Sequence, residues 1–290
     1  MTPFEDFAAA KTRVAASASL HPLTTIRVDA AAQHLAHVGN AWSRAQYDGV
    51  FHLVPPPDDR LPAITLVFVR SGEGNTAAAD PSELGGGDTD KHLIYEGLSR
   101  VAADAVMAGA TTAAGEHVFF SVWHPEMIAL RRELGLRRHP VQVVATGTGC
   151  IDIRTSRVFN VPDVPVYLLA TRGACARLAV PLRERPWVRI VPVEADDLRA
   201  PLEALRAQFG MARISAVGGR TIATALLDAG LVGDVGLTTT ERSAGQPETP
   251  FYVGKRTLPL NPIVSKRSTD PDAPFLFEHF EVGRATDKHR

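Results

Sequence analysis

The chain has few of the features that mark several large classes of protein. Only two of its 290 residues are cysteines, Cys150 and Cys175, too few for a disulfide framework or a four-thiolate zinc site, and this fits a reducing cytosol. The formal net charge is −1. The chain therefore lacks the excess of basic residues by which proteins bind nucleic acids or anionic membranes. No apolar run is long enough to span a bilayer. We therefore expect a cytoplasmic protein that acts on a small molecule.

Residues 1–60 differ in pattern from the rest of the chain. Apolar residues occur at helical spacing in two groups, 4–14 and 28–36, which predicts two modest helices separated by His21-Pro22. A proline run at 55–57 then marks a boundary. No catalytic constellation occurs in this segment. We expect an N-terminal helical extension that packs on the main domain, residues 61–290, or on a partner subunit.

From residue 61 onward, short apolar runs alternate with helical periods. The predicted strands cover residues 63–69, 105–108, 141–145, 166–170, 188–193, 214–217 and 235–240. The predicted helices lie around 89–101, 125–134, 198–209 and 220–229. This alternation is typical of an α/β fold with a mostly parallel sheet covered by helices on both faces. Residues 257–266 and 275–282 predict paired strands that add an antiparallel C-terminal edge.

A strand that runs through two glycines into a helix stands out at residues 214–230. Gly218 and Gly219 let a ligand approach the backbone, and the N–H groups of Gly219, Arg220 and Thr221 lack intrahelical partners. With the helix dipole and the charge of Arg220, these donors suit a pyrophosphate, although a tight turn alone has the same pattern. Loops 71–88, 109–116 and 146–149 also follow strands, so we expect them to meet these glycines at one crevice.

Three stretches carry a resemblance to a known family. LSRVAADAVMAGATTA (98–113), VVATGTG (143–149) and ISAVGGRTIATALLDAGLVGD (214–234) occur in that order. They resemble the reductase domain of RibD-type riboflavin-biosynthesis deaminase/reductases, within the dihydrofolate-reductase-like superfamily. The resemblance covers residues 64–282. The deaminase half has no counterpart, because its zinc signature of His-x-Glu and Pro-Cys-x-x-Cys is absent.

The resemblance implies an NADPH-dependent oxidoreductase that forms a homodimer. The residues implied to bind the cofactor are Gly109, Thr112, Thr146, Gly218, Gly219, Arg220 and Thr221. Arg100 falls where the family has an arginine that meets the substrate, a role in which a guanidinium suits a sugar phosphate; a solvated helix residue is the alternative. His117, His124 and His139 do not form a metal-ligand spacing, and we expect no metal.

The implied substrate side departs from the family pattern. Glu73 and Asn75 replace the Asp and Lys of Ser-x-Asp-Gly-Lys, Glu116 replaces an Asp, and Val217 replaces the Glu of Glu-Gly-Gly. Each change lengthens or removes a polar group, and a misplaced acceptor costs both affinity and rate. The sequence therefore supports either a riboflavin-pathway reductase that tolerates these changes or, as we favour, a relative that reduces another substrate.

Hydride transfer places the demanding chemistry in the cofactor, so the protein must chiefly position a C=N or C=O carbon. Glu73 or Glu116 would orient the substrate or relay a proton; taken alone, each also fits a solvated loop carboxylate. A third hypothesis is a catalytically silent paralogue that binds a dinucleotide and has a structural or regulatory role.

Overall fold

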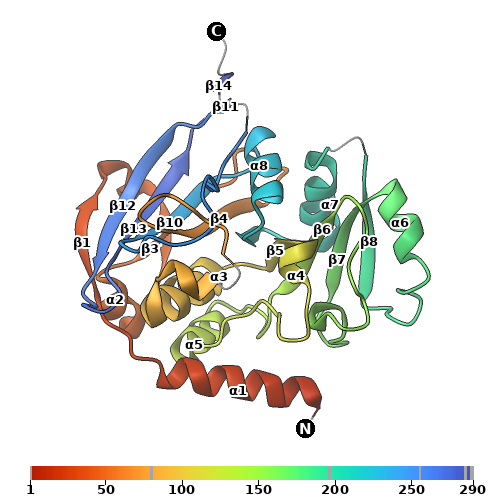
Figure 1. Ribbon diagram of the computed structural model, residues 1–290, viewed down its shortest axis with the longest axis horizontal. Coiled ribbons are helices and arrows are strands. Elements are labelled where there is room, and N and C mark those ends of the chain that lie inside the picture. Colours follow the sequence, from red (N-terminus) through yellow and green to blue (C-terminus); the bar gives the residue numbers. More distant parts are fainter. Residues whose placement is uncertain (1, 79–80, 195–196, 255, 284–285, 288–290) are drawn as a thin grey trace.

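A single ten-stranded sheet forms the frame of the computed structural model, which describes residues 2–78, 81–194, 197–254, 256–283 and 286–287 (Figure 1). The strand order is β1-β12-β13-β10-β4-β9-β5-β6-β7-β8. The bounds are β1 (Leu23–Val28), β4 (Ala63–Arg70), β5 (Ala105–Gly109), β6 (Val141–Thr146), β7 (Val166–Thr171), β8 (Val188–Val193), β9 (Arg213–Val217), β10 (Asp234–Thr240), β12 (Leu260–Ser268) and β13 (Phe275–Val282). Neighbours from β10 to β8 are parallel, while β13, β12 and β1 are antiparallel. The predicted α/β sheet with an antiparallel edge is confirmed.

Helices cover both faces of this sheet (Figure 1). On one face lie α7 (Arg199–Phe209) and α8 (Arg220–Asp228). The other elements are α1 (Pro3–Ser17), α2 (Ala41–Tyr47), η3 (Thr89–Leu98), α3 (Ser99–Val101), α4 (Ala110–Ala113), α5 (Pro125–Glu133), α6 (Arg172–Leu178), the short turns η1 (Ala30–His34), η2 (Pro81–Leu84) and η4 (Arg157–Phe159), and two small ribbons, β2 (Ala36–Val38) with β3 (Phe51–Leu53) and β11 (Arg256–Thr257) with β14 (Thr286–Asp287). Of these, α1, η3, α3 and α5 lie on the opposite face of the sheet from α7 and α8.

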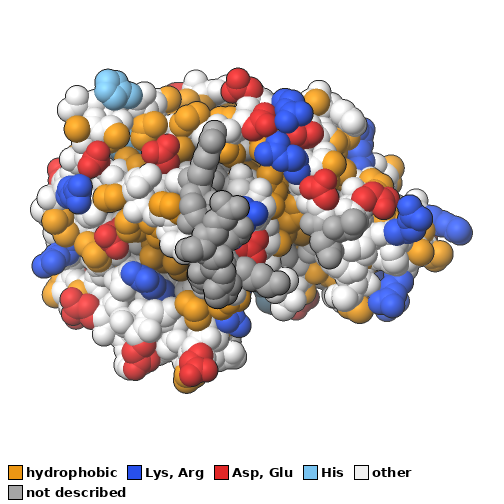
Figure 2. Space-filling view, turned by 90° about the horizontal axis from the view of Figure 1, so that it is seen from above, with side chains coloured by type: hydrophobic (Ala, Val, Ile, Leu, Met, Phe, Trp, Pro, Cys, Tyr) orange, Lys and Arg blue, Asp and Glu red, His pale blue; other side chains and the backbone are white. Residues whose placement is uncertain are grey.

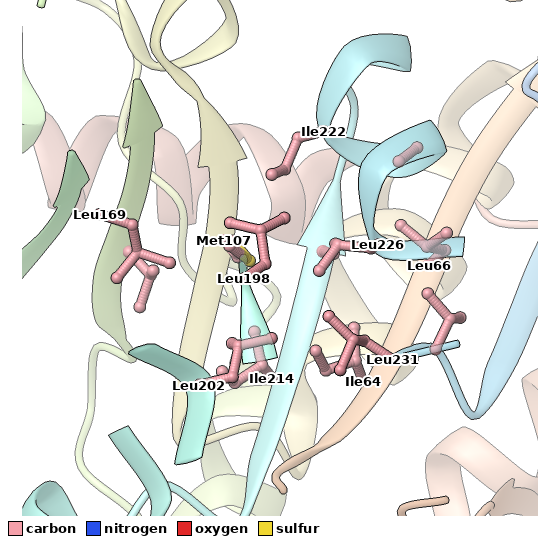
Figure 3. Packing of buried hydrophobic residues seen from close by; sticks show 14 of the residues in the cluster. Ile64, Leu66, Met107, Leu169, Leu198, Leu202, Ile214, Ile222, Leu226 and Leu231 are labelled. Atoms are coloured by element: carbon pink, nitrogen blue, oxygen red, sulfur yellow. The ribbon is translucent and has the colours of Figure 1, made fainter. Parts of the chain in front are cut away.

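The core under α8 fixes the position of the glycine turn. Ile222 and Leu226 project from α8 toward Leu66, Met107 and Ile214 on three neighbouring strands (Figure 3). Burial of each large apolar side chain contributes roughly 1.5–3 kcal/mol to folding. The start of α8 is therefore anchored over the carboxyl ends of β4, β9 and β5.

The N-terminal segment differs from the sequence prediction. Helix α1 is present as predicted, but the second predicted helix, over residues 28–36, is wrong, because Val28 ends strand β1, residues 30–34 form only a short 3₁₀ turn and residues 36–38 form strand β2. Strand β1 pairs with β12 in the main sheet. The strand sequence LTTIRV is rich in β-branched residues, which favour an extended backbone. The Asp29 side chain then accepts a hydrogen bond from the Ala31 N–H and starts only a short 3₁₀ turn. The extension is thus part of the sheet as well as a cover for it.

The helix predicted to begin at Thr89 or Asp90 is a π-helix, η3, over its first ten residues. Its wider turn brings backbone groups close at Gly97, where a Cβ atom would lie 2.6 Å from the His92 carbonyl oxygen. Neither Thr89 nor Asp90 caps this helix, because Thr89 accepts a hydrogen bond from the His21 N–H and Asp90 accepts one from Thr238. π-Helical turns occur frequently at functional sites.

Surface charge on the face seen from above is mixed, with acidic and basic side chains interspersed among apolar ones (Figure 2). In the described part of the chain, no helix combines the length and apolar character that a membrane span needs.

Candidate cofactor and substrate site

Two glycines at the end of β9 lie against the start of α4. Gly218 and Gly219 have φ angles of +72° and +81°, a backbone region that favours glycine. A Cβ atom on Gly219 would lie 3.5 Å from Oγ1 of Thr112 and 3.7 Å from the backbone nitrogen of Gly109. On Gly218 it would lie 3.4 Å from Cγ2 of Thr112. Because β5 and β9 are parallel neighbours, their carboxyl ends bring these four predicted cofactor residues together.

Helix α8 begins at Arg220, directly after the glycines, and is nine residues long. Within the described residues, no side chain caps this helix start, and the first N–H groups of a helix have no intrahelical partner. The Arg220 side chain is partly buried and Thr221 is exposed. These donors, with the positive end of the helix dipole, form a place where an anion is stabilised.

The loop after β6 extends this edge toward α6. The hydroxyl of Thr146 accepts a hydrogen bond of 2.9 Å from the Gly149 N–H, which closes the loop. Arg177 on α6 donates to the carbonyl oxygen of Thr148 at 3.0 Å, and Arg172 at the start of α6 is largely exposed. Two arginines therefore flank the loop that carries the predicted cofactor residue Thr146. Arg177 lies five residues after Arg172 on the same helix.

Arg100 is not a solvated helix residue. Its side chain is only 2% exposed, it lies 4.5 Å from the centre of the Tyr95 ring, and it donates to the carbonyl oxygen of Ser121 at 3.1 Å. Its Nε has no hydrogen-bond partner among the described residues. The guanidinium is therefore held in place with one donor unused, and its predicted contact with a substrate anion stays a prediction.

Val217 ends β9 on the face that η3 covers. The side chain is fully buried in an apolar cluster with Val106, Ala108 and Ala113, against which Tyr95 packs. No acceptor oxygen is present at this position. The surroundings of Val217 suit an aliphatic side chain, and a carboxylate there would need a partner to offset its desolvation.

Glu73 lies in the loop after β4 and is tied to the loop after β10. The hydroxyl of Ser243 donates to Glu73, and Nδ2 of Asn75 donates to its other carboxylate oxygen at 3.4 Å. Asn75 itself is buried and accepts a 3.4 Å hydrogen bond from the Thr249 N–H. The polar pair that replaces the family's Asp and Lys thus joins two loops at the carboxyl end of the sheet.

Glu116 is on the surface. Its side chain is 73% exposed and forms an ion pair only with His117, itself 81% exposed, within the described structure. The structure therefore separates Glu116 from the buried groups described above, and its predicted catalytic role stays untested.

Asp90 is a buried carboxylic acid that the sequence analysis did not identify as a functional residue. It is 7% exposed, and Thr238 of β10 donates a hydrogen bond to it. Burial raises the pKa of Asp90 to about 6, against the lowering effect of that hydrogen bond. Thr238 and Val217 lie on strands β10 and β9, with β4 between them, so the Asp90 carboxyl is hydrogen-bonded to a strand that is not adjacent to β9. Its partner is 148 residues distant in sequence, which explains why no local motif revealed it.

The family model that describes the RibD C-terminal domain matches residues 62–266. The chain belongs to the RibD C-terminal domain family. This match covers all the predicted site residues, and it makes the chain a member of an oxidoreductase family. No curated protein sequence matches the chain.

Solved structures support the same fold for this RibD C-terminal domain. A pyrimidine reductase-like protein from Corynebacterium diphtheriae is 22% identical with a TM-score of 0.62, covering 77% of this chain and 92% of that one. Acinetobacter baumannii RibD is 16% identical with a TM-score of 0.57; the match covers 77% of this chain but only 58% of RibD. The Saccharomyces cerevisiae riboflavin biosynthesis reductase Rib7 is 15% identical with a TM-score of 0.51, covering 78% and 92%. The predicted α/β fold class, with a mostly parallel sheet and an antiparallel edge, is the fold that these structures share.

Proposed function

We propose that this RibD C-terminal domain protein is an NADPH-dependent reductase that transfers hydride to a C=N or C=O carbon of a small substrate. The observation that carries the proposal is the close approach of Gly218 and Gly219 to Thr112 and Gly109, where a Cβ added to Gly219 would lie within 4 Å of both Thr112 and Gly109. Side chains are missing where a dinucleotide backbone would lie, and the uncapped start of α8 is adjacent. The space beside the two glycines, which an added Cβ atom would begin to fill, suits a pyrophosphate.

Residues of the chain have distinct roles in this proposal. The pyrophosphate would accept hydrogen bonds from the N–H groups of Gly219, Arg220 and Thr221. The nicotinamide would lie on the side of Gly109 and Thr112. Thr146 and the arginines near α6 lie toward the adenosine. Bound NADPH supplies the hydride, so the chain itself must orient the acceptor carbon and deliver a proton to the neighbouring nitrogen or oxygen.

We propose Asp90 as the proton donor. Its pKa of about 6 leaves roughly a tenth of the Asp90 carboxyl groups protonated at pH 7, and a general acid works best with a pKa close to the operating pH. Replacing Asp90 with Asn removes the proton and keeps an acceptor for Thr238. We expect kcat to fall by about two orders of magnitude, the usual contribution of a general acid, with loss of the pH dependence near 6. Asp88→Asn, which changes an exposed carboxylate in the same segment, is the matched control.

The substrate we favour is not the ribosylaminopyrimidine phosphate of riboflavin biosynthesis. Val217 cannot accept a hydrogen bond that a glutamate would, and an unpaired polar group on a buried substrate costs about 1–3 kcal/mol. Asn75 lacks the lysine charge, and Glu73 and Glu116 each displace a carboxylate by one methylene. Even partly additive losses lower kcat/KM by at least about a hundredfold, since 1.36 kcal/mol is a factor of ten.

The deciding assay follows NADPH oxidation with the authentic pathway intermediate, beside Acinetobacter baumannii RibD as the reference. We expect turnover far below the reference, together with faster turnover of another imine or carbonyl compound. Efficiency equal to the reference would restore the riboflavin-pathway activity. NADPH binding without oxidation across imine, carbonyl and dihydropterin substrates would instead favour the catalytically silent paralogue.

A further inference from the structure

Helix α1 precedes the part of the chain that the family model matches, residues 62–266, yet it packs beside the proposed cofactor site. Ala15 is fully buried in the same apolar cluster as Ala113, and Phe7 packs against that cluster. Ala113 directly follows the predicted cofactor residue Thr112. An element outside the family domain therefore contacts the core on which helix α4 rests.

Arg157 connects α1 to the loop that follows α4. Its guanidinium lies 4.2 Å from the centre of the Phe7 ring, and its Nε donates a hydrogen bond to the backbone carbonyl oxygen of Glu116. A guanidinium can stack on an aromatic face and donate hydrogen bonds in its own plane at the same time. Phe7 thus holds the guanidinium in the orientation in which it reaches the Glu116 backbone.

The same loop is attached to the segment of Arg157 through backbone groups as well. The Arg157 N–H donates to the carbonyl oxygen of Gly115 at 3.0 Å, and the Gly115 N–H donates to Oγ of the buried Ser156 at 3.3 Å. Gly115 has a φ of +110°, a backbone region that favours glycine. Residues 156 and 157 therefore determine the shape of the turn at Gly115.

Gly115 lies close in sequence to the predicted cofactor residue Thr112. Only Ala113 and Ala114 separate them, and Ala113 is fully buried. Cγ2 of Thr112 lies 3.4 Å from the position that a Cβ atom on Gly218 would occupy. A shift of Gly115 would therefore be transmitted over a short distance to the space beside the two glycines.

We propose that Arg157 is a positioning residue for NADPH and that Phe7 acts through it, an inference that rests on the proposed reductase function. Neither side chain needs to touch the cofactor. The apparent affinity for a ligand falls with the fraction of protein whose site is in the binding-competent conformation. Loosening the loop should therefore raise the KM for NADPH and leave kcat at saturation unchanged, because bound cofactor restores the position of the loop.

Two phenylalanines on α1 provide a matched pair of variants. Phe7→Leu removes the aromatic face under Arg157 and keeps an aliphatic side chain against Trp123, whose ring lies 5.8 Å from that of Phe7. It should raise the dissociation constant for NADPH at least about threefold in isothermal titration. Phe4→Leu makes the same change one turn earlier, where the ring lies 4.7 Å from that of Phe119. It should lower the melting temperature to a similar extent and leave NADPH affinity unchanged.

A double-mutant cycle tests whether Phe7 acts through Arg157. Arg157→Gln should weaken NADPH binding at least as much as Phe7→Leu does. Adding Phe7→Leu to Arg157→Gln should then cause no further loss, because the contact between the two side chains is already broken. Arg154→Gln removes an exposed arginine from the same segment and should bind NADPH like the unmodified protein.

Hydrogen exchange follows the loop without the cofactor. In cofactor-free protein, Phe7→Leu should speed exchange of the Gly115 and Arg157 amide hydrogens, and Phe4→Leu should not. Unchanged NADPH affinity in Phe7→Leu, an equal loss in Phe4→Leu, or additive effects of Phe7→Leu and Arg157→Gln would each overturn the proposal. An unmodified protein that does not bind NADPH would refute the proposed function instead, and the exchange rates would then show whether α1 fixes the loop.

Discussion

Replacement of Gly219 by alanine separates the effect of a backbone turn from the effect of a cofactor site. Gly219 has a φ of +81°, and its new Cβ would lie 3.3 Å from Cγ2 of Ile222 and 3.5 Å from Oγ1 of Thr112. A side chain at such a backbone angle costs about 1–3 kcal/mol. We therefore expect a lower free energy of unfolding as well as weaker cofactor binding.

The binding loss should be larger than strain alone explains. In the proposed site, the Cβ would occupy the space that the pyrophosphate approaches, and hydrogen bonds to a charged group are worth about 1.5–3 kcal/mol each. Loss of one such bond weakens NADPH binding by about tenfold to a hundredfold. Isothermal titration measures the affinity, and urea unfolding measures the stability.

Gly230 supplies the matched control at the other end of the same helix. Its φ is +65°, and nothing lies within 4 Å of an added Cβ. Gly230→Ala should lower stability by about 1–2 kcal/mol and leave NADPH affinity unchanged. Equal NADPH affinity in Gly219→Ala and Gly230→Ala would refute the reasoning, because the glycine pair would then serve only as a turn.

Three further predictions concern the cofactor, the buried acid and the assembly. NADPH should bind at least about tenfold more tightly than NADH, because one charge-assisted contact to the 2′-phosphate is available only to NADPH. Arg172→Ala should reduce this preference. Equal affinities of the unmodified protein for NADPH and NADH would refute the prediction. Because burial raises the pKa of Asp90 from 3.8 to about 6, folded protein holds this proton more tightly than unfolded protein, and stability falls as pH rises from about 4 to 6. In urea unfolding, the free energy of unfolding of Asp90→Asn should exceed that of the unmodified protein by up to about 3 kcal/mol at pH 7 and should equal it below pH 4. A difference between the two proteins that does not change with pH would contradict this. Light scattering should report a homodimer of the 31.2 kDa chain, with a monomer at assay concentrations as the contrary result.

The sheet and the glycine turn were predictable because their signals are local. Residues 63–69 and 141–145 are short apolar runs, and the observed strands β4 and β6 begin at the same residues and end one residue later. Gly218 and Gly219 directly precede a helix, so the strand-turn-helix order was visible in the sequence itself. Parallel pairing then brought Gly109 and Thr112 to the same place.

The parts that could not be predicted depend on contacts between distant segments. Asp90 has its raised pKa because β10 and η3 enclose it, and its hydrogen-bond partner comes from the far end of the chain. Residues 23–28 form a strand because β12 offers an edge to pair with. The exposure of Glu116 and the burial of Arg100 likewise depend on which faces η3 and its neighbours cover, which periodicity alone does not specify.

The position of bound NADPH tests the central claim most directly. A crystal structure of the complex should place pyrophosphate oxygens within about 3 Å of the backbone nitrogens of Gly219, Arg220 and Thr221, with the nicotinamide on the side of Gly109 and Thr112. A complex in which NADPH lies elsewhere, or a protein that does not bind NADPH at millimolar concentration, would contradict the account.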